Sequence, residues 1–174
     1  MRVYIPATVR MLQTLVTERE LRPVNFTAFA VTPALREAYS SGDDDELAEV
    51  AMAEAARASL RLLASESGDG ADVHDSEGAP IRRRAVIAAD IDEVRLRPDL
   101  DDAVVRLTAP LAYSQVASAH VDLAEAESTI ERAMAVIDDA DLGDADAEFV
   151  LGDAEDHELA WYAAQELPFL VELL

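Results

Sequence analysis

The segment from Asn25 to Val31 constrains the fold most, because the strand that it predicts carries apolar side chains on both faces. Because side chains alternate along a strand, one face carries Phe26, Ala28 and Ala30. The opposite face carries Thr27, Phe29 and Val31. A strand that is apolar on both faces must be covered on both sides of its sheet. The segment therefore predicts an interior strand that is buried from two sides.

Threonine and proline mark the ends of predicted strands and the starts of predicted helices. Arg2 to Ile5 is a short β-like run that Pro6 ends, because proline cannot donate to a strand ladder. Thr8 is placed to cap the helix that follows. Thr32 before Pro33 has the pattern of an N-cap and a first helical residue, so a second, short helix is expected there.

The acidic run over 41–46 opens a predicted helix over about 45–64. Carboxylates in a first helical turn accept hydrogen bonds from free N–H groups, so the run indicates a helix start rather than a cation site. The next segment, Ser65 to Pro80, has three glycines and Val73 as its one large apolar residue. This composition predicts a mobile surface loop around His74.

The second half of the chain is expected to open with strands and to end with a helix. The β-rich runs are Ile81 to Ile91, Ala103 to Thr108 and Val116 to Asp122. Asp122 is placed to cap the next helix, and Glu148 to Leu151 is a candidate short edge strand. A final helix over Asp153 to Glu166 carries the only tryptophan, Trp161, whose large ring we expect to be buried against the sheet.

Together these elements predict an α+β fold, with a mixed β-sheet of about five strands packed with four to five helices. The 174 residues are enough for one domain and short for two. The loop at about 65–80 separates two halves, and neither half carries enough for a complete core alone. We therefore expect residues 1–174 to form a single domain.

The composition excludes several classes of function. Without cysteine the chain has no disulfide framework, thiol nucleophile or cysteine-bound zinc, and without lysine it has no Schiff-base chemistry. A net charge of −22 argues against nucleic acid and anionic membranes as partners. The longest charge-free stretch, Leu107 to Val121, is too short and polar to span a bilayer. The start lacks the basic and apolar regions of a signal peptide, so a cytoplasmic location is expected.

The start of the expected final helix holds candidate site residues. A neutral imidazole beside carboxylates could bind a divalent metal, with Asp153, Asp156 and His157 as ligands, or act as a general base next to Glu158. In the alternative, structural interpretation, the carboxylates stabilise the helix start and His157 packs beside Trp161. A single histidine has no ligand-spacing signature, so no metal or other cofactor is predicted.

His120 is the second candidate histidine. Ser118, His120 and Asp122 share one face of their predicted strand and have the residue types of a catalytic triad. They stand side by side, however, whereas a triad needs a chain from nucleophile to base to orienting carboxylate, so a polar face toward solvent is the simpler interpretation. If this strand is central, His120 and His157 could meet in one cleft, which is the only metal geometry that the sequence suggests.

Several segments resemble a known family: Met1 to Thr8 with Val31 to Tyr39, Ala55 to Leu63, and Gly152 to Pro168. They are similar to a family of short, acidic, uncharacterised actinobacterial proteins, a domain of unknown function. The resemblance covers nearly the whole chain except Ser65 to Pro80. It implies a bacterial cytoplasmic protein with a single-domain layout, and it transfers no activity, cofactor or catalytic residue.

The sequence leaves two functions open. After Arg132 there are twelve Asp and Glu and no basic residue, so the chain is suited to a non-enzymatic interaction or regulatory role with a basic protein partner. The alternative explanation of this acidity is that it only keeps the protein soluble. The second function is a small metal-dependent or His/carboxylate hydrolase built around His120, His157 and Glu158. The sequence does not indicate the oligomeric state.

Overall fold

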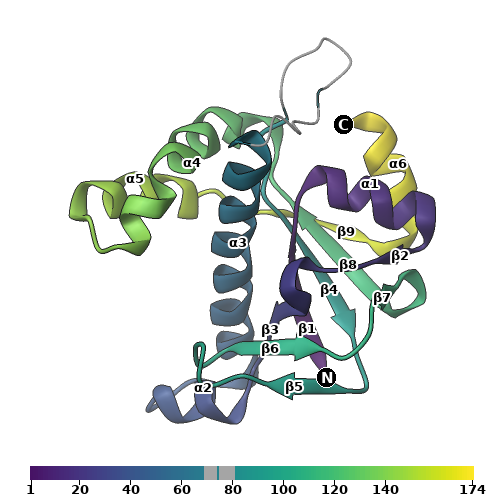
Figure 1. Ribbon diagram of the computed structural model, residues 1–174, viewed down its shortest axis with the longest axis horizontal. Helices are drawn as coiled ribbons and strands as arrows, with labels where there is room; N and C mark the ends of the chain where they lie inside the picture. Colours follow the sequence, from purple (N-terminus) through teal and green to yellow (C-terminus); the bar gives the residue numbers. More distant parts are fainter. Residues whose placement is uncertain (69–73, 75–80) are drawn as a thin grey trace.

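The computed structural model describes residues 1–68, 74 and 81–174. Its main sheet is built from β1 (Arg2–Ala7), β3 (Thr27–Phe29), β4 (Ala85–Asp90), β5 (Val94–Leu96), β6 (Val104–Leu107), β8 (Val116–Val121) and β9 (Ala160–Ala163). These seven strands lie in the order β5-β6-β3-β1-β4-β8-β9 (Figure 1), and each described pair is antiparallel. A second, two-stranded sheet pairs β2 (Glu20–Leu21) with β7 (Leu111–Ala112).

Six α-helices accompany the sheets within the described residues: α1 (Val9–Glu18), α2 (Pro33–Ala38), α3 (Asp44–Gly68), α4 (Glu127–Asp141), α5 (Ala145–Glu155) and α6 (Leu167–Leu173). The caps predicted for the first two are confirmed. Thr8 accepts a hydrogen bond from the Met11 N–H at 3.3 Å, and Thr32 accepts one from the Leu35 N–H at 3.0 Å.

Helices cover both faces of the main sheet (Figure 1). On one face, side chains of α1 and α6 pack with alternate strand residues such as Ala28. On the other face, side chains of α3 pack with the intervening residues, including Phe29 and Val86. The prediction that residues 25–31 form an interior strand covered from two sides is therefore confirmed, although β3 itself is shorter than that segment.

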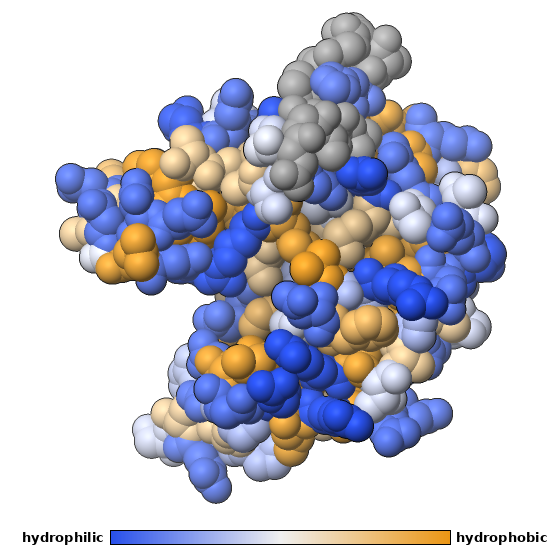
Figure 2. Space-filling view, in the orientation of Figure 1, coloured by the Kyte–Doolittle hydropathy of each residue, from blue (hydrophilic) through white to orange (hydrophobic). Residues whose placement is uncertain are grey.

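The helices α4 and α5 form an arm with a small core of its own. Ile130 and Ile137 of α4 and Leu151 of α5 pack against Leu60 and Leu63 in the second half of α3. Figure 2 shows a notch in the outline of the molecule below this arm. The arm thus extends the surface beside α3 beyond the edge of the sheet.

The predicted α+β class is confirmed, but the sheet differs in detail from the prediction. It is larger than about five strands and antiparallel rather than mixed, because short strands such as β5 and β9 add at its edges. The helix predicted over 45–64 runs on to Gly68, so the first four residues of the loop expected at 65–80 are helical. The rest of that loop lies outside the described residues except for His74, which is exposed.

The predictions for the last part of the chain are wrong. Glu148 to Leu151 lies inside α5 rather than in a strand. Of the helix expected over Asp153 to Glu166 only the first three residues are α-helical, at the end of α5, and Ala160–Ala163 form β9. Asp144 starts α5 early by accepting the Ala147 N–H at 2.8 Å, and the helix is complete at Glu155. Tyr162 then packs into the core under α1 and α6, while Trp161 on the opposite face is 61% exposed and not buried.

Candidate functional site

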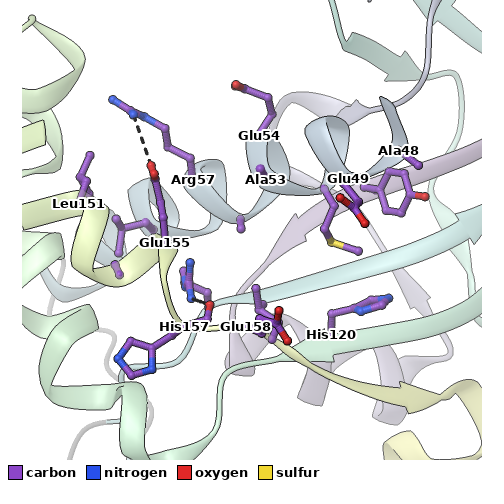
Figure 3. A pocket seen from close by; sticks show the side chains of 17 residues that line it. Ala48, Glu49, Ala53, Glu54, Arg57, His120, Leu151, Glu155, His157 and Glu158 are labelled. Carbon is purple, nitrogen blue, oxygen red and sulfur yellow. Dashed lines mark hydrogen bonds and ion pairs between the residues drawn. The ribbon is translucent and has the colours of Figure 1, made fainter. Parts of the chain in front are cut away.

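A cavity of about 750 Å³ lies between α3, the sheet and the end of α5 (Figure 3). The helix α3 forms one wall, and the segment 157–159 that connects α5 to β9 lies across from it. The polar or charged side chains that line the cavity are Tyr4, Glu49, Glu54, Arg57, Arg84, Glu155, His120, His157 and Glu158. Their charges decide what the cavity can bind.

Arg84 is neutralised by a buried ion pair at the sheet end of the cavity. Both oxygens of Asp122 accept hydrogen bonds from the Arg84 guanidinium at 2.8 Å, and Asp122 Oδ2 also accepts the Arg84 backbone N–H at 2.8 Å. The two side chains are 5% and 0% exposed. Arg84 Nη2 further donates to the carbonyl of His157 at 2.9 Å, which ties the segment 157–159 to the sheet.

The prediction that Asp122 caps a helix is therefore wrong. The helix α4 begins only at Glu127, and Asp122 directly follows β8 with its carboxylate fully buried. A buried carboxylate needs a cation and hydrogen-bond donors to offset the loss of water, and Arg84 supplies both.

Arg57 of α3 is neutralised as well. Its guanidinium donates to Asp141 at 3.0 Å and to Glu148 at 2.8 Å, and it lies 4.0 Å from Glu155. The hydrogen bond to Glu148 is the largest factor that raises the pKa of Arg57 above its usual value. The side chain therefore joins α3 to the α4–α5 arm and leaves no free positive charge for a ligand.

The negative charges of the glutamates in the cavity are less well compensated by nearby cations than the charges of the two arginines are by carboxylates. Within the described part of the chain, Glu49, Glu54 and Glu158 form no ion pair within 4.0 Å. Partial burial raises the pKa of Glu54, and the negative charge of Asp101 raises it further. Because both arginines are already paired, these carboxylates make the cavity acidic.

His120 projects from β8 into the same cavity (Figure 3). Its Nε2 lies 3.1 Å from the Ser118 hydroxyl oxygen, so these two residues share a face as predicted. Burial lowers the pKa of His120, and the charge of Arg2 lowers it further, which favours the neutral imidazole. The expected solvent-facing polar strand is wrong for Ser118 and Asp122, because both are buried.

The structure brings only some of the candidate residues together. His120, His157 and Glu158 line the cavity, whereas Asp153 and Asp156 are exposed and do not line it. In Figure 3 the ring of His157 points away from Glu158 and His120. Among the residues that the structure describes, no group of three or more histidine or carboxylate side chains is arranged to hold a metal ion.

Sequence reasoning missed the residues that set the charge of the cavity. Glu49, Glu54 and Arg57 lie on the polar side of α3, where charged residues look like an ordinary solvated face. Arg84 was missed as well, because its partner Asp122 is 38 residues away in the sequence. The useful signal is an arginine directly before one apolar strand, β4, and an aspartate directly after another, β8. Two such residues lie close together when the strands are antiparallel neighbours.

The fold and the site define a class of protein: an acidic α+β protein with an antiparallel sheet and an acidic cavity beside its longest helix. The chain belongs to DUF6912, a family of unknown function whose model matches residues 1–171. The predicted resemblance to a family without assigned function is thereby confirmed. No curated protein and no solved structure matches the chain. In the described part of the chain, no helix combines the length and apolarity needed to cross a membrane.

Proposed function

We propose that this protein is a non-enzymatic interaction or regulatory protein of the cytoplasm, and that its acidic cavity binds a basic segment of a partner protein. One observation carries the proposal. Both arginines that line the cavity are held by carboxylates, while Glu49, Glu54 and Glu158 line it without an ion pair among the described residues. A cationic ligand would supply the missing positive charge.

The size and lining of the cavity support a long basic side chain as the ligand. About 750 Å³ lies within the roughly 300–1,000 Å³ that is typical of binding pockets. Arginine and lysine carry an apolar stem below a charged head, and the lining offers apolar surface at Met52, Ala53 and Leu159 next to the glutamates. Charge-assisted hydrogen bonds to carboxylates would then fix the head group.

The charge of the whole molecule supports the same kind of partner. With a net charge of −22, the protein attracts cations over a distance set by the ionic strength. The acidic residues after Arg132 include Glu148, Glu155 and Glu158, which lie at or beside the cavity. Such a field accelerates association with a basic partner, and the affinity should fall as salt is added.

The proposal is tested with a fluorescein-labelled tetra-arginine peptide and fluorescence anisotropy at low salt. The variant Glu49→Gln/Glu158→Gln should bind at least about tenfold more weakly, since the loss of even one charge-assisted hydrogen bond, about 1.5–3 kcal/mol, already corresponds to about tenfold or more. The matched control is Glu18→Gln/Glu172→Gln, which removes the same charge from exposed positions outside the cavity. An equal loss of affinity in both variants, or no binding by the wild type, would contradict the proposal.

A second candidate function is a small metal-dependent or His/carboxylate hydrolase that uses His120, His157 and Glu158. The contact between His120 and Ser118 favours it, because a neutral imidazole bonded to a hydroxyl can accept its proton. The test is hydrolysis of p-nitrophenyl esters and phosphates, with and without Zn²⁺ or Mn²⁺. Turnover that is lost in both His120→Gln and His157→Gln supports a hydrolase. Turnover that survives in both variants, or is absent from the wild type, excludes it.

A further inference from the structure

The strand β9 is the last strand at one edge of the described seven-stranded sheet. It pairs with β8 in an antiparallel register that sets His120 opposite Trp161 and Ser118 opposite Ala163. An edge strand presents a row of backbone N–H and C=O groups to the outside, and such a row is a template for another strand. The residues at both ends of β9, Ala160 and Ala163, are half-buried alanines, whose small side chains cover little of the neighbouring backbone.

Trp161 lies on the same face of the sheet as the cavity. Residues that are directly opposite on paired strands project from the same face, so Trp161 stands beside His120, which lines the cavity. The indole is 61% exposed. An exposed indole is a favourable surface for an arginine or lysine side chain, because the face of its ring attracts cations.

The surroundings of β9 are acidic. Glu158 comes shortly before the strand and lines the cavity, and Glu166 comes shortly after it. Natural edge strands are commonly protected by shortness, a lysine, a proline or an inward-pointing charge, and the four residues of β9 include no lysine, proline or charged side chain. The Ala163 N–H already donates to Glu166 Oε2 at 3.1 Å, so the part of the edge that remains open to another strand is the part around Trp161. The edge around Trp161, with carboxylates and an exposed indole beside it, is suited to a basic strand.

We infer that β9 is the docking edge for an extended basic segment of a partner protein, which joins the sheet as an additional strand. The inference rests on the proposed function and specifies how the basic segment binds. In an added strand every second side chain projects from the same face, with a repeat of about 6.6 Å. One basic side chain of the segment then lies over Trp161, and another reaches the carboxylates of the cavity.

A second copy of this chain is a poorer occupant of the edge. Pairing two β9 strands would bring together two molecules that each carry a net charge of −22. It would also set the acidic residues that flank β9, Glu158 and Glu166, close to their counterparts. Like charges at close range oppose association, whereas a basic segment removes the repulsion.

The test compares two labelled peptides of equal charge. One, the alternating peptide, alternates threonine and arginine, and the other has the same sequence with every backbone nitrogen after the first residue methylated, so that it has no backbone N–H to donate to a neighbouring strand. The alternating peptide should bind at least about tenfold more tightly, and it should slow hydrogen exchange at residues 160–163. It should also change the fluorescence of Trp161, the only tryptophan.

Matched variants test the contribution of the indole. Trp161→Ala should weaken binding of the alternating peptide about fivefold, in line with loss of a cation–π contact. Phe149→Ala removes another exposed aromatic side chain, from α5, and should leave the affinity unchanged. An equal effect of the two variants would contradict a specific role for β9.

The remaining outcomes separate the inference from the proposed function. Equal affinity for both peptides, with Glu49→Gln/Glu158→Gln still weakening it, would overturn the docking edge and leave the acidic binding cavity in place. No binding of either peptide would overturn both. A dimer in sedimentation experiments that Trp161→Ala dissociates would also overturn the inference, because the edge would then belong to a second copy.

Discussion

Removal of the Asp122 carboxylate should destabilise the protein strongly. Asp122→Ala leaves the Arg84 guanidinium, 5% exposed in the wild type, buried without its counter-ion. It also takes away the acceptor of the Arg84 backbone N–H. Breaking one side of a buried ion pair costs about 3–5 kcal/mol, which is a large part of the roughly 5–15 kcal/mol by which a domain is stable. The loss arises mainly from the stranded charge, not from the lost attraction.

The double variant Arg84→Met/Asp122→Leu distinguishes these two causes. It removes both charges and keeps apolar volume, so it should recover about half or more of the lost stability. Full recovery is not expected, because the His157 carbonyl loses the donor that Arg84 provided.

The assay is urea unfolding followed by circular dichroism, with the free energy of unfolding extrapolated to water. The control is Asp90→Ala, which removes an exposed ion pair with Arg2 at 2.8 Å and should cost less than about 1 kcal/mol. A cost for Asp122→Ala no larger than that of the control would refute the reasoning. So would a double variant that is less stable than Asp122→Ala.

Two further predictions concern exposed or half-buried side chains. Trp161→Ala should lower the free energy of unfolding by less than about 1 kcal/mol, because the ring is 61% exposed, and a loss of about 3 kcal/mol in urea unfolding would contradict its position. Glu54 has a pKa raised above its usual 4.5, so its contribution to stability is present below pH 4.5 and is lost as the pH rises through the raised value. Glu54→Gln should therefore raise the melting temperature at pH 7 and have little effect below pH 4.5, and the opposite pH dependence in thermal melts would contradict this assignment.

Local signals in the sequence predicted the parts of the fold that local interactions determine. Thr8 and Thr32 cap their helices through backbone N–H groups three residues away, so the pattern is visible in a short window. The strand around Phe29 was predictable because its alternation reports burial on both faces.

The end of the chain could not be predicted in the same way. The acidic residues from Asp153 to Glu158 resemble the first turn of a helix, whereas in the structure they end α5 and lead into β9. Two interactions decide that this part of the chain forms a strand and not a helix: the pairing of β9 with β8, and the packing of Tyr162 under α1 and α6. Both are long-range contacts. The pair of Arg84 and Asp122 was missed for the same reason, since it depends on β4 and β8 being neighbours.

Solubility alone does not account for the placement of the acidic residues. A role in solubility requires negative charge on the open surface, where carboxylates are fully hydrated and their ionisation is unopposed. Glu54 instead lines a cavity in which partial burial and Asp101 oppose its ionisation. The arginines at the same cavity are paired with Asp122, Asp141 and Glu148, and although Arg57 and the neighbouring Arg61 lower the pKa of Glu54, it stays above its usual value. A cation bound in the cavity would favour the ionised form of Glu54, so ligand binding should release protons near the raised pKa, which a role in solubility does not require.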